Sequence, residues 1–133
     1  KMHVAHVGDS RTYMYYKKHI FQLTIDHSVK NFIDRGWLPK TALQQGAKEG
    51  ALVRALGLSD HCDVDIYEVD LMPGMVIITC SDGLSGMISD RRIAQILTDN
   101  LGNFEELPKV LINAANAAGG RDNITVLVSK VEE

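Results

Sequence analysis

The sequence has few of the features that mark several common classes of protein. It contains only two cysteines, Cys62 and Cys80, and no Cys-x-x-Cys motif. Such a pair fits neither a disulfide framework nor a zinc site, so we expect two reduced thiols in the core. No apolar run approaches the roughly 18 residues that a membrane-spanning helix needs, and no charged and apolar leader is present. We therefore expect a cytoplasmic protein with no membrane contact.

Excess positive charge is also absent. The formal net charge is −3, and the only local basic cluster is Lys17-Lys18-His19, which we interpret as a solvated turn. This balance provides no field that would attract nucleic acid or an anionic membrane. A length of 133 residues with 45% hydrophobic and 23% charged residues is typical of one globular domain with a buried core.

The first half of the chain has the pattern of three strands followed by a short helix. The ranges 2–7, 12–16 and 20–24 are rich in β-branched and aromatic residues and are separated by turn-forming residues, which predicts a three-stranded meander. Ser28 can cap a short helix that Gly36 would end.

Glycines and a proline interrupt the next segment, up to about residue 53. We expect it to be mobile, with one or two helical turns.

The second half alternates strands and helices. A strand over 63–71, with a bulge between Ile66 and Val69, precedes the apolar central strand 75–80. Helices are predicted to begin at Ser89 and near Pro108. With a last strand over 124–128, this order predicts an α+β fold, an antiparallel sheet with helices packed on one face.

Three aspartates lie at predicted strand ends. Asp9 follows the first strand, Asp82 follows the central strand, and Asp122 precedes the last one. If the last strand runs antiparallel to the other two, all three carboxylates reach the same rim of the sheet. Their neighbours are small or turn-forming, as in Ser81-Asp82-Gly83, so backbone and solvent can approach closely. Converging carboxylates would repel one another unless Mg²⁺ or Mn²⁺ neutralised them.

Simpler roles for these residues compete with metal binding. Taken singly, Asp9 and Asp82 could cap turns and Asp122 could form an Asx-turn. The histidines offer no competing chelating pair, because His3 and His6 point to opposite faces of a strand. His27 is expected to order the entry of the helix after Ser28.

Five segments occur in the order found in one known family. "VAHVGDSRTYMY", "LTIDHS", "LVRALG", "VIITCSDGLSGMIS" and "GGRDNITVLV" resemble segments of the metal-dependent serine/threonine protein phosphatases of type 2C (PPM), particularly bacterial ones. The resemblance covers nearly the whole chain. It implies a β-sandwich with flanking helices and a binuclear Mn²⁺ or Mg²⁺ site at one end, with a third, weaker metal.

The resemblance also assigns roles to residues. Asp82 and Asp122 would be ligands of the binuclear site, and Asp9 would join Asp82 at the third metal. Three further residues would hold these ligands in place without binding the metal: Gly83, Asn123 and Ser10. The segment of about 29–53 resembles a flap beside the active site.

The implied activity is the hydrolysis of phosphoserine and phosphothreonine in phosphoproteins by metal-activated water.

The chain matches only the C-terminal half of the family's catalytic domain, because the segments "Asn-Glu-Asp" and "Asp-Gly-Met-Gly-Gly" are not found. Its opening on Lys1 and a strand-like run also suggests an excised piece. We expect an incomplete domain, weak or inactive alone, with an exposed apolar sheet face that favours dimerisation. The alternative is a non-catalytic, phosphatase-derived module that binds a partner.

Overall fold

Two antiparallel sheets organise the computed structural model, which describes Lys1–Glu133. The larger sheet has the strand order β3-β2-β5-β6, formed by His19–Gln22, Arg11–Tyr16, Val76–Cys80 and Val126–Lys130. The smaller sheet pairs β1 (Met2–His6) with β4 (Asp65–Val69).

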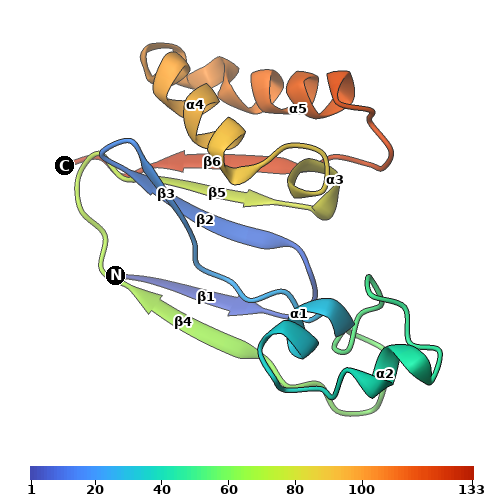
Figure 1. Ribbon diagram of the computed structural model, residues 1–133. Coiled ribbons are helices and arrows are strands. Elements are labelled where there is room, and N and C mark those ends of the chain that lie inside the picture. Colours follow the sequence, from blue (N-terminus) through green and yellow to red (C-terminus); the bar gives the residue numbers. More distant parts are fainter.

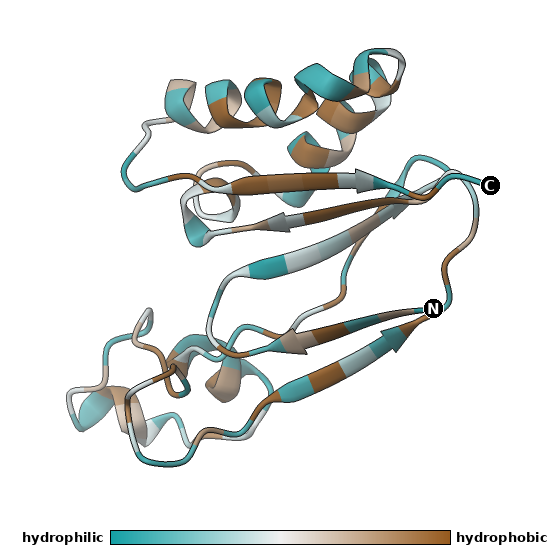
Figure 2. Ribbon diagram, turned by 180° about the vertical axis from the view of Figure 1, so that it is seen from behind, coloured by the Kyte–Doolittle hydropathy of each residue, from teal (hydrophilic) through white to brown (hydrophobic).

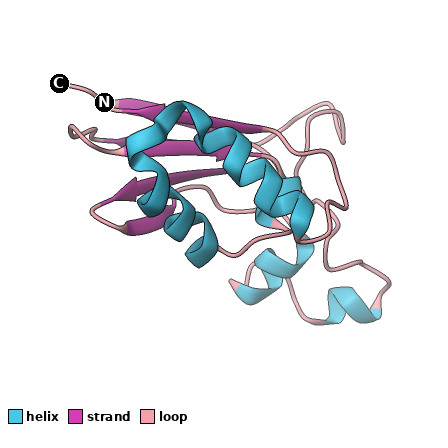
Figure 3. Ribbon diagram, turned by 90° about the horizontal axis from the view of Figure 1, so that it is seen from above, coloured by secondary structure: helices cyan, strands magenta, loops and turns pink.

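The longer helices cover one face of the larger sheet. They are α4 (Asp90–Asn100) and α5 (Leu107–Ala117), joined by the 3₁₀ helix η1 (Leu101–Glu106). Figure 1 shows the β1–β4 pair on the opposite side of the sheet, and Figure 3 shows α4 and α5 lying across its strands. The predicted α+β arrangement with helices on one face is confirmed for this sheet. None of the helices combines the length and the apolar character needed to cross a membrane.

The main core lies between the larger sheet and these helices. Alternate residues of β2 and β5, such as Tyr13 and Ile78, are fully buried there against Leu97 of α4 and Leu111 of α5. This follows from the two-residue period of strands and the 3.6-residue period of helices. Figure 2 shows the apolar side of both helices turned toward the strands.

The predicted helix starts are confirmed by their caps. The hydroxyl of Ser28 accepts a hydrogen bond from the Asn31 amide, at 3.3 Å, where α1 (Val29–Asp34) begins. The hydroxyl of Ser89 accepts one from the Arg92 amide, at 3.2 Å, at the start of α4. Gly36, with φ of +74°, follows the end of α1, as expected.

The predicted meander is wrong in its first strand. β2 and β3 form the expected hairpin, but β1 pairs with β4 in the other sheet. Gly8, with φ of +105°, turns the chain out of β1, and its carbonyl accepts a hydrogen bond from the His27 amide, at 2.8 Å. The peptide groups of β1 therefore bond to β4 and not to β2.

The predicted bulge in β4 is also wrong. Pairing with β1 is continuous from Met2–Val69 to His6–Asp65. The apparent slip in the pattern arises because Ile66 is 65% exposed, so its apolar side chain does not mark the buried face.

The interrupted part after Gly36 contains the short α2 (Thr41–Gln44), and together with α1 it makes up the segment of about 29–53. Its two ends are joined, because the amides of Val29 and Lys30 donate to the carbonyls of Ala51 and Glu49, both at 2.9 Å. Of the one or two helical turns predicted after Gly36, one is present, as α2.

The two cysteines differ in their surroundings. Cys80 is buried in the core, and burial raises the pKa of its thiol to about 11. Cys62 is only half-buried, so the prediction of a core thiol was wrong for it, since its segment between α2 and β4 lies outside the main core.

Candidate active site

Strand register brings the three aspartate-bearing segments to one end of the larger sheet. Arg11, at the start of β2, pairs with Cys80, at the end of β5. Cys80 in turn pairs with Val126, at the start of β6. Because β5 is antiparallel to both neighbours, the loops before β2, after β5 and before β6 emerge side by side.

Two of the aspartates share a polar cavity. Asp9 and Asp82 line a cavity of about 360 Å³ that has no hydrophobic residue in its wall. The remaining lining residues are polar, charged or glycine: Arg11, Asp26, Ser28, Lys30, Glu49, Gly50, Ser85 and Gly86. Burial, followed by the negative charge of Asp82, raises the pKa of the Asp9 carboxyl. A divalent cation between these carboxylates would relieve that repulsion.

Asp122 does not line this cavity. Its carboxylate accepts a hydrogen bond from the amide of the next residue, Asn123, at 2.7 Å, which is one residue short of the bond that defines the Asx-turn considered above. No three His, Cys, Asp or Glu side chains lie close enough together to hold a metal ion. The expected meeting of three carboxylates is therefore seen only for Asp9 and Asp82, because a turn at one end of a sheet can still direct its side chain elsewhere.

The Asp82 turn is packed against the Asp122 loop. Asp82 opens the short helix α3 (Asp82–Ser85), and a side chain at Gly83 would place its Cβ 2.1 Å from the carbonyl oxygen of Asn123. The hydroxyl of Ser81 accepts a hydrogen bond from the Thr125 amide, at 3.0 Å. Gly83 and Asn123 are thus in close backbone contact, whereas Ser10 lines a separate cavity beside Thr79 and Leu127.

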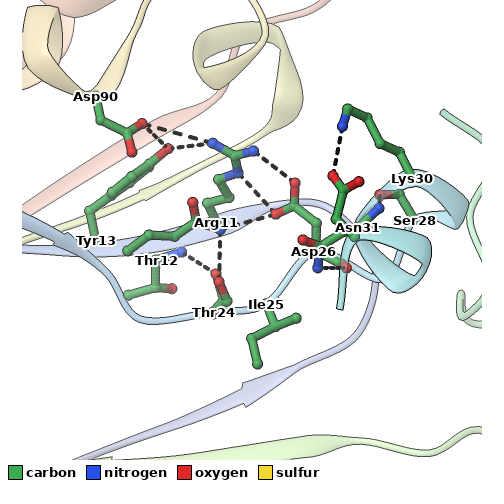
Figure 4. Close-up of polar contacts among 12 residues, drawn as sticks. Arg11, Thr12, Tyr13, Thr24, Ile25, Asp26, Ser28, Lys30, Asn31 and Asp90 are labelled. Carbon is green, nitrogen blue, oxygen red and sulfur yellow. Dashed lines mark hydrogen bonds and ion pairs between the residues drawn. The ribbon is translucent and has the colours of Figure 1, made fainter. Parts of the chain in front are cut away.

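Arg11 is the centre of a network beside the cavity that the sequence reasoning missed (Figure 4). Its guanidinium donates two hydrogen bonds to Asp26, at 2.9 and 2.8 Å, and one to the hydroxyl of Tyr13, at 2.9 Å. That hydroxyl donates to Asp90 at the start of α4, at 2.9 Å. The bonds to Asp26 are the largest cause of the raised pKa of Arg11. The resembling segments "VGDSR" and "LTIDHS" hold both partners, but only the fold shows that they meet.

A second network, also missed, lies beneath the Asp9 turn. The Asp65 carboxylate accepts hydrogen bonds from His27 Nε2 at 2.8 Å, Arg54 at 3.0 Å and the Tyr67 hydroxyl at 3.2 Å. Burial by itself would raise the pKa of Asp65, but the hydrogen bonds and positive charge around it lower it on balance.

Comparison with known proteins gives consistent relatives, although no family model matches the chain. The chain is 36% identical over 126 residues to the serine/threonine phosphatase stp of Listeria monocytogenes, covering 94% of this chain and 50% of that protein. It is 36% identical over 131 residues to the protein phosphatase PhpP of Streptococcus pneumoniae, covering 97% and 53%.

Solved structures agree. The serine/threonine phosphatase of S. agalactiae superposes with a TM-score of 0.83 at 31% identity, covering 97% of this chain and 54% of that one. The serine/threonine phosphatase PstP/Ppp of Mycobacterium tuberculosis gives 0.76 at 29% identity, covering 98% and 55%. The chain thus spans about half the length of the relatives it matches.

These similarities identify the class of protein to which the chain is similar. It has an α+β fold of the protein-phosphatase type, with a polar cavity at one end of its larger sheet. Within that class the proteins that the chain resembles are serine/threonine phosphatases of the PPM, or type 2C, family, and the chain matches about half of such a protein. The predicted family and the predicted incompleteness are confirmed.

The first prediction concerns the packing of Gly83. We expect Gly83→Ala to lower the free energy of unfolding in urea by about 1–3 kcal/mol, because the new methyl group meets a backbone atom that cannot rotate away. Gly50→Ala is the matched control, since Gly50 also lines the cavity and its added Cβ meets open space. Equal stability of the two variants would contradict the close packing of the two loops.

The second prediction concerns pH. A carboxyl group whose pKa is lowered on folding stabilises the fold above its unfolded pKa of about 3.9, and this stabilisation is lost as the pH falls through the folded value. The difference in unfolding free energy between the wild type and Asp65→Asn should therefore be largest above about pH 4 and shrink as the pH falls further.

The control for this titration is Asp63→Asn, because Asp63 is exposed and its carboxylate contacts only His61. We expect a small difference at every pH for that variant. An Asp65→Asn difference that did not change with pH would contradict the network.

Proposed function

We propose that the protein to which this chain belongs removes phosphate from phosphoserine and phosphothreonine in proteins, with Mn²⁺ or Mg²⁺ as cofactor. The observation that carries this proposal is the polar cavity in which Asp9 and Asp82 lie together, neither of them in an ion pair. Its support from comparison is that the matched relatives are protein phosphatases. One similar catalytic domain, that of PstP at 27% identity and a TM-score of 0.72, was crystallised with two manganese ions.

The residues present fit a hard divalent cation in part. Asp9 and Asp82 would hold it with carboxylate oxygens, and Asp122 would add a third carboxylate only if its turn moved. Bound metal lowers the pKa of a water ligand and neutralises charge on the phosphoryl group. In the complete domain we propose two ions, with a third at Asp9 and Asp82.

The chain's own residues define what can enter. No hydrophobic residue lines the cavity, and its charged and polar side chains suit a phosphate group with its hydration shell. Arg11 lines the cavity, but its guanidinium is already bonded to Asp26 and Tyr13, so we assign it to the framework and not to phosphate binding. Lys30 and Glu49 come from the segment of about 29–53, and we propose that this segment is a flap that shapes access for the substrate.

A second candidate function is a non-catalytic module derived from a phosphatase. It is favoured by the lack of three clustered ligands, because two carboxylates leave most positions of a six-coordinate ion to water. This module would bind a partner protein without hydrolysing phosphate.

The third prediction tests catalysis. With excess Mn²⁺ and a phosphothreonine peptide, we expect this chain alone to release phosphate slowly or not at all. A longer form that supplies the rest of the family's domain should release it in a metal-dependent way. Asp82→Asn should reduce that release to background, whereas Asp60→Asn, on an exposed loop, should leave it unchanged.

Two outcomes would separate the candidates. Release that requires both Mn²⁺ and Asp82 supports the phosphatase. A folded longer form that releases no phosphate in excess Mn²⁺ rejects it and favours the binding module.

We also propose that two copies of this chain associate through the sheet face turned away from α4 and α5. Strand register places Thr79 and Leu127 in one row of that face and Phe21 and Met14 in the next, whereas Thr12 and Ile77 of the same rows are buried within the chain. Leu127 is 63% exposed and Phe21 is 51% exposed. Both lie on edge strands, where a second copy can pair with free backbone groups.

The fourth prediction follows from this face. Light scattering after gel filtration should give the mass of a dimer for the wild-type chain. Leu127→Arg should shift the mass toward the monomer, because a charge replaces the apolar contact. Leu56→Arg is the control, since Leu56 is 82% exposed in a loop. A monomeric wild type at high concentration would reject the proposed dimer.

A further inference from the structure

Every polar group of His27 forms a hydrogen bond, and two of these bonds are made with Gly8. Its side chain is 1% exposed. The Gly8 amide donates a hydrogen bond to Nδ1 of the ring, at 3.1 Å. The His27 amide donates to the Gly8 carbonyl, at 2.8 Å. His27 therefore forms hydrogen bonds with both the amide and the carbonyl of Gly8.

These bonds define the tautomer of the ring. A backbone amide can only donate, so Nδ1 of His27 must be the unprotonated acceptor. The ring proton therefore lies on Nε2, which donates to the Asp65 carboxylate at 2.8 Å. The ring cannot bind a metal or a substrate in this position, since neither nitrogen is free.

Asp65 is itself held in place. It accepts further hydrogen bonds from Arg54 and from the Tyr67 hydroxyl, and that hydroxyl accepts one from the Ile25 amide at 3.2 Å. The His27 ring also packs against His6, with ring centres 4.8 Å apart. The ring is therefore fixed from the side opposite to Gly8, as a rigid support needs to be.

Gly8 is the residue through which this support reaches the cavity. Its φ of +105° is a conformation that other residues rarely adopt, while open space surrounds the position of an added Cβ. Glycine is thus required by the backbone angle and not by crowding. The next residue is Asp9, whose carboxylate lines the cavity with Asp82.

We propose that His27 is a positioning residue of the candidate metal site: by holding Gly8 against the Asp65 network, it directs the Asp9 carboxylate into the cavity beside Asp82. The geometry of the turn carries this inference, and its bearing on metal binding rests on the proposed function. His27 itself touches neither metal nor substrate.

Two substitutions separate the two bonds of the ring. In His27→Asn, the side-chain oxygen can occupy the place of Nδ1 and still accept from the Gly8 amide, while the bond to Asp65 is lost. In His27→Gln, the longer amide reaches the place of Nε2 and can donate to Asp65, while the bond from Gly8 is lost. Each variant is thus the control for the other.

The first readout needs no metal. By NMR hydrogen exchange on the folded chain, we expect the protection of the Gly8 amide to fall about tenfold in His27→Gln and to stay near the wild-type value in His27→Asn. Global stability, measured in urea, should fall in both variants. A long-range ¹H–¹⁵N spectrum of the wild type should show His27 with the proton on Nε2.

The second readout is the binding of Mn²⁺ alone, followed by electron paramagnetic resonance. We expect affinity to drop about 10–100-fold in His27→Gln, the range typical when a residue that orients a ligand is changed. His27→Asn should stay within about threefold of the wild type, since its turn is kept. A structural role alone would give both variants the same affinity once folded.

The outcomes distinguish this inference from the proposed function. Unchanged Gly8 protection in His27→Gln, or equal loss of Mn²⁺ affinity in both variants, overturns the positioning role. If the wild type binds no Mn²⁺ while Gly8 protection still separates the variants, His27 does hold the Asp9 turn. In that case the metal site at Asp9 and Asp82 of this chain is rejected, whereas the phosphatase proposal is decided by phosphate release from the longer form.

Discussion

The antiparallel register of β2, β5 and β6 is the constraint on which the candidate site depends. Arg11, Cys80 and Val126 lie in one row across these strands. Their loops therefore emerge together at one end, although the residues are far apart in sequence. A shift of one residue in β5 would move its buried side chains from the helix side to the other face, so the hydrophobic core and the position of Asp82 are fixed by the same hydrogen bonds.

The segment after β3 extends this constraint to the start of β2. The Leu23 amide donates to the carbonyl of Thr12, at 2.8 Å, and the Thr12 amide donates to the Thr24 hydroxyl, at 3.1 Å. Asp26 then meets Arg11 and His27 meets Gly8. The carbonyl of His27 also accepts from the Val53 amide, at 2.8 Å, so the same short segment connects the Asp9 turn with the end of the flap-like region.

The distribution of paired and unpaired carboxylates separates framework from site. Asp26 is neutralised by Arg11, and Asp65 by Arg54. Asp9 and Asp82, by contrast, form no salt bridge and face each other across a polar cavity. Asp82 is exposed and Asp9 is half-buried. A half-buried carboxylate beside a second one is costly unless something compensates it, and a cation is the compensation that oxygen ligands favour. The fold therefore neutralises the carboxylates that hold it together and leaves unpaired the two that a ligand can use.

The sequence by itself determined the local structure and the family. The caps at Ser28 and Ser89, the buried central strand and the three aspartates at one end of a sheet were all readable, because capping, periodicity and turn chemistry act over a few residues. Only the tertiary structure decided that β1 pairs with β4 and not with the expected meander, and that Asp122 bonds within its own turn. It also decided that Arg11 bonds to Asp26 and that His27 bonds to Gly8. The reason is that strand partners and side-chain networks join residues distant in sequence, and their choice depends on which backbone and polar groups remain unsatisfied once the whole chain has packed.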